Sequence, residues 1–358
     1  MSAAKIIGDS TEGDGDFYRL PTPEQFERLE RMAAEALPNW NAEGSKITPI
    51  KYRENAVFGI ERPDGERFVL RIHRPGYRSD DQVRSEFVWM QALAGHGLLT
   101  PAPLSTSGGE PFTHVSVDGV PEPRRSDMLT WIDGSPLGSI EQGAVGGTKA
   151  KARNYRTLGE IAARLHDFGA SWSPPAAFSL PAWDADALVG ENPEWGRFWE
   201  LDCLSDAQRD CVLETRDRVY ERLDDFGKAP DRYGLLHGDF LPENILMADG
   251  RAHLIDFNDA GTGWYLFEFA TSLFFLQTDP DFEIICKALM AGYGSGRPLP
   301  VDYDAMMPTM VMARGLSYLG WPLSRPEIDE ARELAPLLAE HVVELCNVYL
   351  ADELRIPG

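Results

Sequence analysis

Cysteine is scarce in this chain, and no two cysteines are closely spaced. The four cysteines are Cys203, Cys211, Cys286 and Cys346, and the shortest separation is the eight residues between the first two. Zinc sites commonly place paired cysteines about two to four residues apart. The spacing therefore predicts reduced structural thiols rather than a zinc centre or a disulfide framework.

The chain also lacks a long uninterrupted apolar segment. The longest apolar stretch, 264–276, contains Glu268 and is shorter than the roughly 20 residues that a membrane-spanning helix needs. The first residues include one lysine and no sustained apolar run, so we expect no signal peptide. A cytoplasmic protein without a membrane partner is the expectation.

Positive charge is in short supply. The 34 Lys and Arg residues against 57 Asp and Glu residues give a formal net charge of −23. That balance argues against nucleic acid or an anionic membrane as the main partner. An acidic cleft would favour a cationic, amine-bearing ligand, but the same charge is equally explained by solubility, and the sequence leaves both explanations open.

Two polar clusters stand beside apolar, strand-like runs. One contains Asp239 and, five residues later, Asn244; the other contains Asp256, seventeen residues after Asp239. Phosphoryl transfer needs a carboxylate to orient a hydroxyl and accept its proton, and oxygen ligands for magnesium on the nucleotide phosphates. Aspartate is a weak base, yet it suffices because most of the catalysis comes from positioning and charge neutralisation. The pattern predicts a kinase.

The pattern resembles the kinase-like phosphotransferases, the broad family of aminoglycoside phosphotransferases, choline kinases and type II homoserine kinases. The family's catalytic loop, His-Gly-Asp followed by four residues and Asn, stands here as His237-Gly238-Asp239 and Asn244. Its metal motif, an apolar pair before Asp-Phe, stands here as Leu254-Ile255-Asp256-Phe257. The resemblance implies that Asp239 is the catalytic base and that Asn244 and Asp256 hold Mg²⁺. It also implies ATP as the donor, with GTP left open.

The resemblance further implies an α+β, two-lobed protein-kinase-like fold, with a small β-rich N-lobe and a larger, mainly helical C-lobe. We expect a disordered N-terminal tail over 1–20, an N-lobe with the nucleotide-binding strands over 21–127, and a hinge over 128–134. The helical C-lobe, with the catalytic loop and the acceptor pocket, would cover 135–358.

Within the N-lobe, the residue pattern predicts one helix and three strands. Thr22 and Gln25 have the spacing of a capping box at the start of a helix that runs up to Pro38. Turn residues then separate runs rich in β-branched and aromatic residues. The predicted strands are 47–50, 56–61 and 67–73.

Several N-lobe residues match the nucleotide-binding positions of the family. Arg71 takes the place of the strand cation that reaches the α- and β-phosphates, and a guanidinium can hold phosphate bidentately. Fifteen residues later, Glu86 takes the place of the helix Glu that pairs with this cation. The turn 52–56 would cover the phosphates; it lacks the glycines of a protein-kinase loop, and Asn55 and Arg53 are its candidate contacts.

The remaining candidates lie at the hinge and after the metal motif. Thr130 and Ile132 would offer backbone groups to adenine. Asp259 could contribute to substrate or metal. Glu268 is nearly alone in an apolar helix, so it needs a partner, either the catalytic-loop backbone or Arg314; we favour a structural role over its alternative role as a substrate contact.

The C-terminal part is predicted to be helical over 282–293, 303–319 and 328–350, the last interrupted near Pro336. In the family this region forms most of the acceptor pocket. The sequence thus predicts transfer of the γ-phosphoryl group of ATP, with Mg²⁺, to a hydroxyl of a small molecule, an antibiotic or an amino alcohol or amino acid. A stress-response-type Ser/Thr protein kinase and a catalytically silent nucleotide-binding scaffold are the alternatives. The oligomeric state and the identity of the acceptor are left open.

Overall fold

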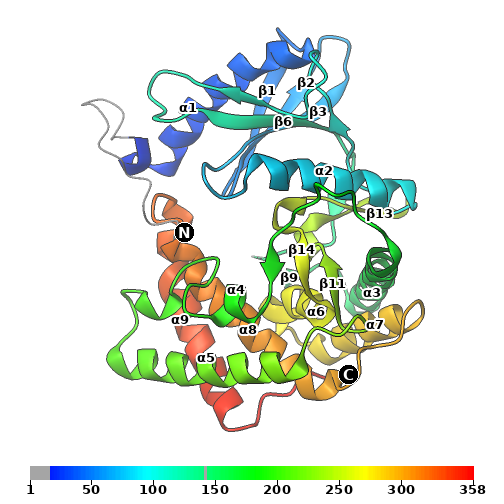
Figure 1. The fold of residues 1–358 in the computed structure, drawn as a ribbon, viewed down its shortest axis with the longest axis vertical. Coiled ribbons are helices and arrows are strands. Elements are labelled where there is room, and N and C mark those ends of the chain that lie inside the picture. Colours follow the sequence, from blue (N-terminus) through cyan, green and yellow to red (C-terminus); the bar gives the residue numbers. More distant parts are fainter. Residues whose placement is uncertain (1–16, 141–142) are drawn as a thin grey trace. The chain divides into compact units, whose positions relative to one another are not determined.

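The computed structural model describes residues 17–140 and 143–358, and they form two compact units (Figure 1). Unit 1 comprises the described residues up to Gln91, together with Pro101–Asp133 and Arg325–Arg332. Unit 2 comprises Ala92–Thr100, Gly134–Ser324 and Glu333–Gly358. The expected lobes were contiguous in sequence. In the structure, 92–100 belong to unit 2 instead of the N-terminal unit, and 325–332 belong to unit 1 instead of the C-terminal unit.

The segment expected to be a disordered tail lies mostly outside the described residues. Its last part is ordered: Phe17–Arg19 forms a short 3-10 helix, η2. Phe17 is fully buried in the core of unit 1, and the guanidinium of Arg124 lies 5.1 Å from its ring centroid. The tail prediction is therefore wrong for these residues, because the aromatic side chain gains more from burial than the short segment loses in chain entropy.

Unit 1 is built on an antiparallel sheet with the strand order β1-β2-β3-β6-β4, and β5 also pairs with β6. The strands are β1 (Lys46–Tyr52), β2 (Ala56–Glu61), β3 (Arg67–Ile72), β4 (Pro103–Leu104), β5 (Thr113–Val115) and β6 (Arg124–Thr130). Buried and less buried residues alternate along β2, as expected when a strand turns one face to a core. The three predicted strands are confirmed.

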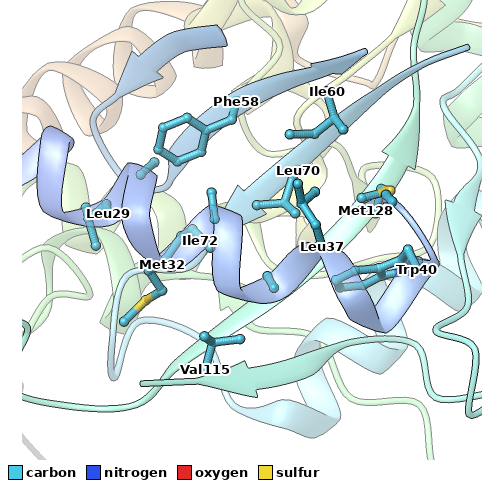
Figure 2. Packing of buried hydrophobic residues seen from close by; sticks show 14 of the residues in the cluster. Leu29, Met32, Leu37, Trp40, Phe58, Ile60, Leu70, Ile72, Val115 and Met128 are labelled. Atoms are coloured by element: carbon cyan, nitrogen blue, oxygen red, sulfur yellow. The ribbon is translucent and has the colours of Figure 1, made fainter. Parts of the chain in front are cut away.

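Helix α1 (Thr22–Ala36) supplies the other side of the unit 1 core. Figure 2 shows Leu29 and Met32 of this helix beside Phe58 of β2 and Ile72 of β3. Burying a large apolar side chain of this kind contributes about 1.5–3 kcal/mol. The short helix η3 (Leu37–Trp40) extends the same core.

The predicted capping box at the start of α1 is wrong. The N-cap is Pro21, without a side-chain cap, and the Thr22 hydroxyl accepts a 2.8 Å hydrogen bond from the Asp329 amide. Gln25 donates to the backbone oxygens of Leu20 and Glu327, at 2.9 Å each. Tertiary contacts with 325–332 have thus replaced the local cap.

Helix α2 (Asp80–Gly95) begins in unit 1 and ends in unit 2. The longer helices that follow are α3 (Thr148–Ser171), α5 (Asp206–Phe226), α6 (Tyr265–Leu273), α7 (Phe282–Gly294), α8 (Tyr303–Leu323) and α9 (Asp329–Leu350); α4 (Ala185–Val189) is short. The last three match the predicted C-terminal helices. Helix α9 continues through Pro336, so the predicted interruption is wrong; proline removes one helical hydrogen bond, and packing of the flanking turns maintains the helix.

Three small sheets in unit 2 connect its helices. One has the order β10-β14-β11 and one β13-β12-β7, while β8 pairs with β9. Their bounds are β7 (Ser135–Pro136), β8 (Gly138–Ser139), β9 (Gly143–Ala144), β10 (Ala182–Trp183), β11 (Tyr233–Leu236), β12 (Ile245–Ala248), β13 (Arg251–Leu254) and β14 (Gly261–Trp264). Strands β11, β12 and β13 flank the loops that carry the candidate chemistry.

Helices α3 and α7 cross at unusually close range (Figure 1). A Cβ on Gly159 would lie 2.0 Å from the Leu289 oxygen, and one on Gly292 would lie 2.0 Å from the Arg156 oxygen. Only glycine permits this backbone approach. No helix in the described part of the chain is long and apolar enough to cross a membrane.

The α+β fold with an antiparallel N-terminal sheet and a mainly helical C-terminal part, predicted from the sequence, is confirmed.

Candidate active site

The catalytic-loop residues follow strand β11 and lead through the 3-10 helix η5 (Pro242–Asn244) into β12. The Asn244 Nδ2 atom donates to Asp239 Oδ2 at 2.8 Å and to the Asp239 backbone oxygen at 2.9 Å. The turn of η5 brings Asn244 back onto the residue five positions before it. The Asp239 side chain is 22% exposed, whereas Asn244 is buried. The carboxylate is therefore both oriented and accessible.

Gly238 allows the loop to lie against the segment that follows the metal motif. Its φ is +83°, and a Cβ there would lie 2.0 Å from the Asp259 backbone oxygen. The same oxygen accepts a 2.8 Å hydrogen bond from the Trp183 indole. Both the left-handed backbone and the close approach require glycine, which explains why this residue stands before Asp239.

Asp256 lies beside Asn244 at the base of the β12–β13 hairpin. Ile245 pairs with Leu254, and the Ile255 amide donates to the Asn244 oxygen at 2.9 Å. Asp256 itself has φ +62°, in the left-handed region that aspartate tolerates. The hairpin register thus brings the backbones of the two predicted metal ligands close together.

The chemistry of these donors fits magnesium. Because the Asn244 amide nitrogen is used by Asp239, its oxygen is the atom that can coordinate a cation. That oxygen and the Asp256 carboxylate are the hard ligands that Mg²⁺ prefers, and Mg²⁺ is usually held by one or two protein ligands together with substrate phosphates. The described residues contain no cluster of three or more His, Cys, Asp or Glu side chains that could hold a metal ion.

Glu268 of α6 anchors the catalytic loop. It is 1% exposed, and its Oε1 accepts from the amides of His237 at 2.5 Å and Gly238 at 3.3 Å. The loop backbone, one of the two partners expected for it, is therefore present. Burial raises the pKa of Glu268 to about 7, although the two amide hydrogen bonds lower it. The geometry gives Glu268 a positioning role rather than the alternative role of a substrate contact.

The titration of Glu268 should be visible in the stability of the protein. Its pKa is raised from 4.5 to about 7 on folding, so between these values the folded state keeps a proton that the unfolded state has lost. The free energy of unfolding then falls by about 1.4 kcal/mol for each pH unit as the pH rises through this window. Glu268→Gln keeps an acceptor oxygen but cannot titrate. We therefore expect the difference in the free energy of unfolding between wild type and variant to change with pH by that slope.

Urea unfolding of both proteins from pH 4.5 to pH 8, spanning the window set by the pKa of Glu268, tests this expectation. His237 contributes the opposite slope, because burial lowers its pKa from 6.5 to about 4. That contribution is common to both proteins and cancels in the difference. A difference that stays constant with pH would show that Glu268 remains ionised throughout.

The two histidines near the loop, His166 and His237, are fully buried. His237 Nε2 lies 2.9 Å from the Ile255 oxygen, and its lowered pKa keeps it neutral. His166 is fully buried, stacks on Tyr265 and lies 3.1 Å from the Tyr293 hydroxyl. Burial lowers the pKa of His166 as well.

The structure adds a second partner for Asp239. The Arg314 Nη2 atom of α8 donates to Asp239 Oδ1 at 2.9 Å. The sequence had suggested Arg314 as a partner for Glu268. The feature that pointed to Arg314 was its position as a lone charge in an apolar helix. Which carboxylate it meets depends on helix packing. Asp259 is also buried, and its charge acts on Arg314.

In unit 1, Arg71 binds two buried carboxylates. Its Nη1 lies 2.9 Å from Glu86, the partner expected from the sequence, and its Nε and Nη2 atoms each lie 2.8 Å from an Asp127 oxygen. Asp127 also contacts His73. Burial by itself would raise the pKa of Asp127, but Arg71 and His73 hold it below its usual range. Sequence reasoning missed Asp127, which stands directly opposite Arg71 in the β3–β6 register.

The weaker nucleotide candidates have partners within unit 1. Arg53 forms an ion pair with Glu330 at 2.6 Å, and Asn55 Oδ1 accepts from the Arg74 amide at 3.2 Å. The backbone amide of Thr130 donates to the Ala102 oxygen at 2.9 Å. That donor is used within unit 1, and adenine recognition by the other backbone groups of Thr130 and Ile132 stays a prediction.

This fold, together with the aspartate that Asn244 and Arg314 orient in the loop after β11, indicates the class of phosphotransferases. Residues 46–308 match the model of the phosphotransferase enzyme family. The chain belongs to this family, and it is an enzyme: a kinase with an alcohol group as acceptor. The family and the reaction class predicted from the sequence are thereby confirmed.

Three similar proteins illustrate the family. A homoserine kinase of Gluconobacter oxydans is 28% identical over 276 residues, which are 74% of this chain and 78% of that protein. Amicoumacin kinase of Bacillus subtilis is 23% identical over 248 residues, 68% of this chain and 67% of that protein. The structure of the microcompartment-associated aminopropanol kinase has a TM-score of 0.79 and 28% identity, covering 91% of this chain and 99% of that one.

Proposed function

We propose that this kinase transfers the γ-phosphoryl group of ATP to a hydroxyl of a small, amine-bearing molecule. The observation that carries the proposal is the 2.8 Å hydrogen bond from Asn244 to Asp239. It aims the carboxylate and leaves the amide oxygen of Asn244 for a cation. Use of ATP would place the reaction in the cytoplasm. The test below compares ATP with GTP and so shows which nucleotide is the donor.

Asp239 would orient the acceptor hydroxyl and accept its proton late in the transfer. A weak base is adequate for this step, because positioning and charge stabilisation supply most of the rate enhancement in phosphoryl transfer. Asn244 and Asp256 would hold Mg²⁺ through their side-chain oxygens. When bound, the cation neutralises charge that develops on the phosphate oxygens.

Arg71 would bind the nucleotide phosphates. Asp127 and Glu86 hold its guanidinium from two sides, so the cation is fixed in orientation before any ligand arrives, which lowers the entropic cost of binding. The backbone of Ile132 would contact adenine, and Asn55 would help to cover the phosphates. The division into an N-lobe with the nucleotide-binding strands, a hinge at 128–134 and a helical C-lobe with the acceptor pocket belongs to the same proposal.

An amine-bearing acceptor is supported by two independent features. Homoserine and aminopropanol, which name two of the similar kinases, each carry a hydroxyl and an amine. The net charge of −23 raises the local concentration of cations near the protein. Asp259 is a candidate contact for such an amine, whereas Glu268 is already engaged by the loop backbone.

The proposal is tested by magnesium-dependent nucleotide consumption with ATP or GTP against a panel of amino acids, amino alcohols, aminoglycosides and unmodified protein. We expect one small hydroxyl compound to stimulate consumption and to acquire phosphate. Phosphate on Ser or Thr of protein would instead support the stress-response-type kinase. Tight ATP binding without turnover on any compound would favour the nucleotide-binding scaffold.

A further inference from the structure

Arg314 lies in the middle of α8, in a run of buried and mostly apolar residues. Its side chain is 1% exposed, and Nη2 lies 2.9 Å from Asp239 Oδ1. Removing a charge from water costs several kcal/mol unless a partner compensates it. The position of this arginine therefore calls for an explanation beyond helix formation.

Three aromatic rings surround the guanidinium of Arg314. Its central carbon lies 4.3 Å from the ring centroid of Tyr318, 5.1 Å from that of Trp195 and 5.3 Å from that of Phe267. Stacking on aromatic faces stabilises a desolvated guanidinium. The rings come from α6, α8 and the segment after α4, so the packing of unit 2 restricts Arg314 to one orientation, with one edge turned to Asp239.

Arg314 and Asn244 together hold both oxygens of the Asp239 carboxylate. Arg314 binds Oδ1 at 2.9 Å, and Asn244 binds Oδ2 at 2.8 Å. Asp239 is partly exposed, whereas Arg314 is buried. A bound acceptor would therefore contact Asp239, and Arg314 would affect the reaction only by holding Asp239 in place.

The local charge points the same way. Asp259, and Glu268 above the pH at which it ionises, also interact electrostatically with Arg314, so this buried cation faces more than one carboxylate. Without it, these groups would repel one another in a poorly hydrated environment. We propose that Arg314 is a positioning residue that fixes the plane of the Asp239 carboxylate so that it faces the acceptor hydroxyl. This inference rests on the proposed function.

Steady-state kinetics of two Arg314 variants distinguish a positioning role of this residue from a role in folding. Arg314→Met removes the charge with similar bulk, and Arg314→Lys retains it without the planar fork. We expect kcat to fall about 100-fold in the methionine variant, the effect of misplacing a reacting group by about 1 Å, with partial recovery in the lysine variant. The nucleotide Kd and the acceptor KM should change little. A methionine variant with wild-type kcat would overturn the proposal.

Arg216→Met is the matched control. Arg216 of α5 also stacks on a tryptophan, with its guanidinium carbon 4.8 Å from the Trp199 centroid, and it pairs with Glu191. Arg216 is not one of the residues described above as binding Asp239 or the catalytic loop. We expect its kcat to stay within about twofold of wild type, as for an independent site.

A thermal-unfolding cycle over Arg314→Met, Asp239→Asn and the double variant tests the contact without any acceptor. If Arg314 fixes Asp239, the shifts in Tm are not additive, because each single variant already removes the ion pair between the two residues. Additive shifts would overturn the proposal even when kcat falls. If the wild type phosphorylates no acceptor, the proposed function fails, while this cycle still decides whether Arg314 holds Asp239.

Discussion

Replacing Asp239 with asparagine is expected to lower kcat for acceptor phosphorylation by about 10³-fold, a typical loss for a group that handles the proton. The asparagine keeps the shape of the side chain, and its single amide oxygen can accept from Arg314. Asn244 keeps its 2.9 Å hydrogen bond to the backbone oxygen of residue 239, so the loop should retain its conformation. Nucleotide binding should be preserved, because the proposed phosphate and adenine contacts lie elsewhere in the sequence. The measurements are steady-state kinetics with the acceptor found in the panel and calorimetric titration with ATP.

Asp249→Asn provides the control for this prediction. Asp249 lies in the turn between β12 and β13, is exposed, and has a positive φ of 51°, a conformation that asparagine also tolerates. Its replacement should leave kcat unchanged. If Asp239→Asn abolished ATP binding together with transfer, the aspartate would be structural and the catalytic assignment would be wrong.

Replacing Arg71 with methionine is expected to have the largest effect on stability. Arg71 is the cation between Glu86 and Asp127, whose side chains are 3% and 0% exposed. Removing one partner of a buried ion pair leaves uncompensated charge and costs about 3–5 kcal/mol. Urea unfolding measures the loss, and ATP titration of the protein that remains folded would show weakened binding if Arg71 contacts the phosphates.

Two further variants make this prediction specific. Arg67→Met, on the same strand, removes an exposed pair with Asp133 and should cost at most about 1 kcal/mol. Combining Arg71→Met with Asp127→Asn should recover part of the stability, because one of the two stranded charges is gone. A double variant as unstable as the sum of the two single variants would show that Arg71 and Asp127 are not energetically coupled.

Local sequence patterns sufficed for much of the fold. The alternation along 56–61 and the apolar spacing of the C-terminal helices are properties of one segment each, so the strands and helices could be located without tertiary information. Local rules failed where a distant segment competed. Thr22 and Gln25 have capping-box spacing, yet their side chains bond to residues near position 327, and Pro336 does not end its helix.

The candidate site divides in the same way. Asp239, Asn244 and Asp256 could be proposed from the sequence as one site, because a single loop and a single hairpin connect them. The pair of Arg71 and Glu86 could be proposed only by resemblance. Asp127 and the contact of Arg314 with Asp239 could not be read from the sequence, since they join residues 56 and 75 positions apart.

The sequence by itself determined the reaction class, because the spacing of residues in the catalytic loop decides which polar side chains a tight turn can bring together. Only the tertiary structure decided what holds these groups in place. Glu268 meets the loop amides, Arg314 meets Asp239, and Asp127 meets Arg71. The physical reason is that a buried charge must find a partner, but strand register and helix packing, rather than sequence spacing, determine which partner lies within reach.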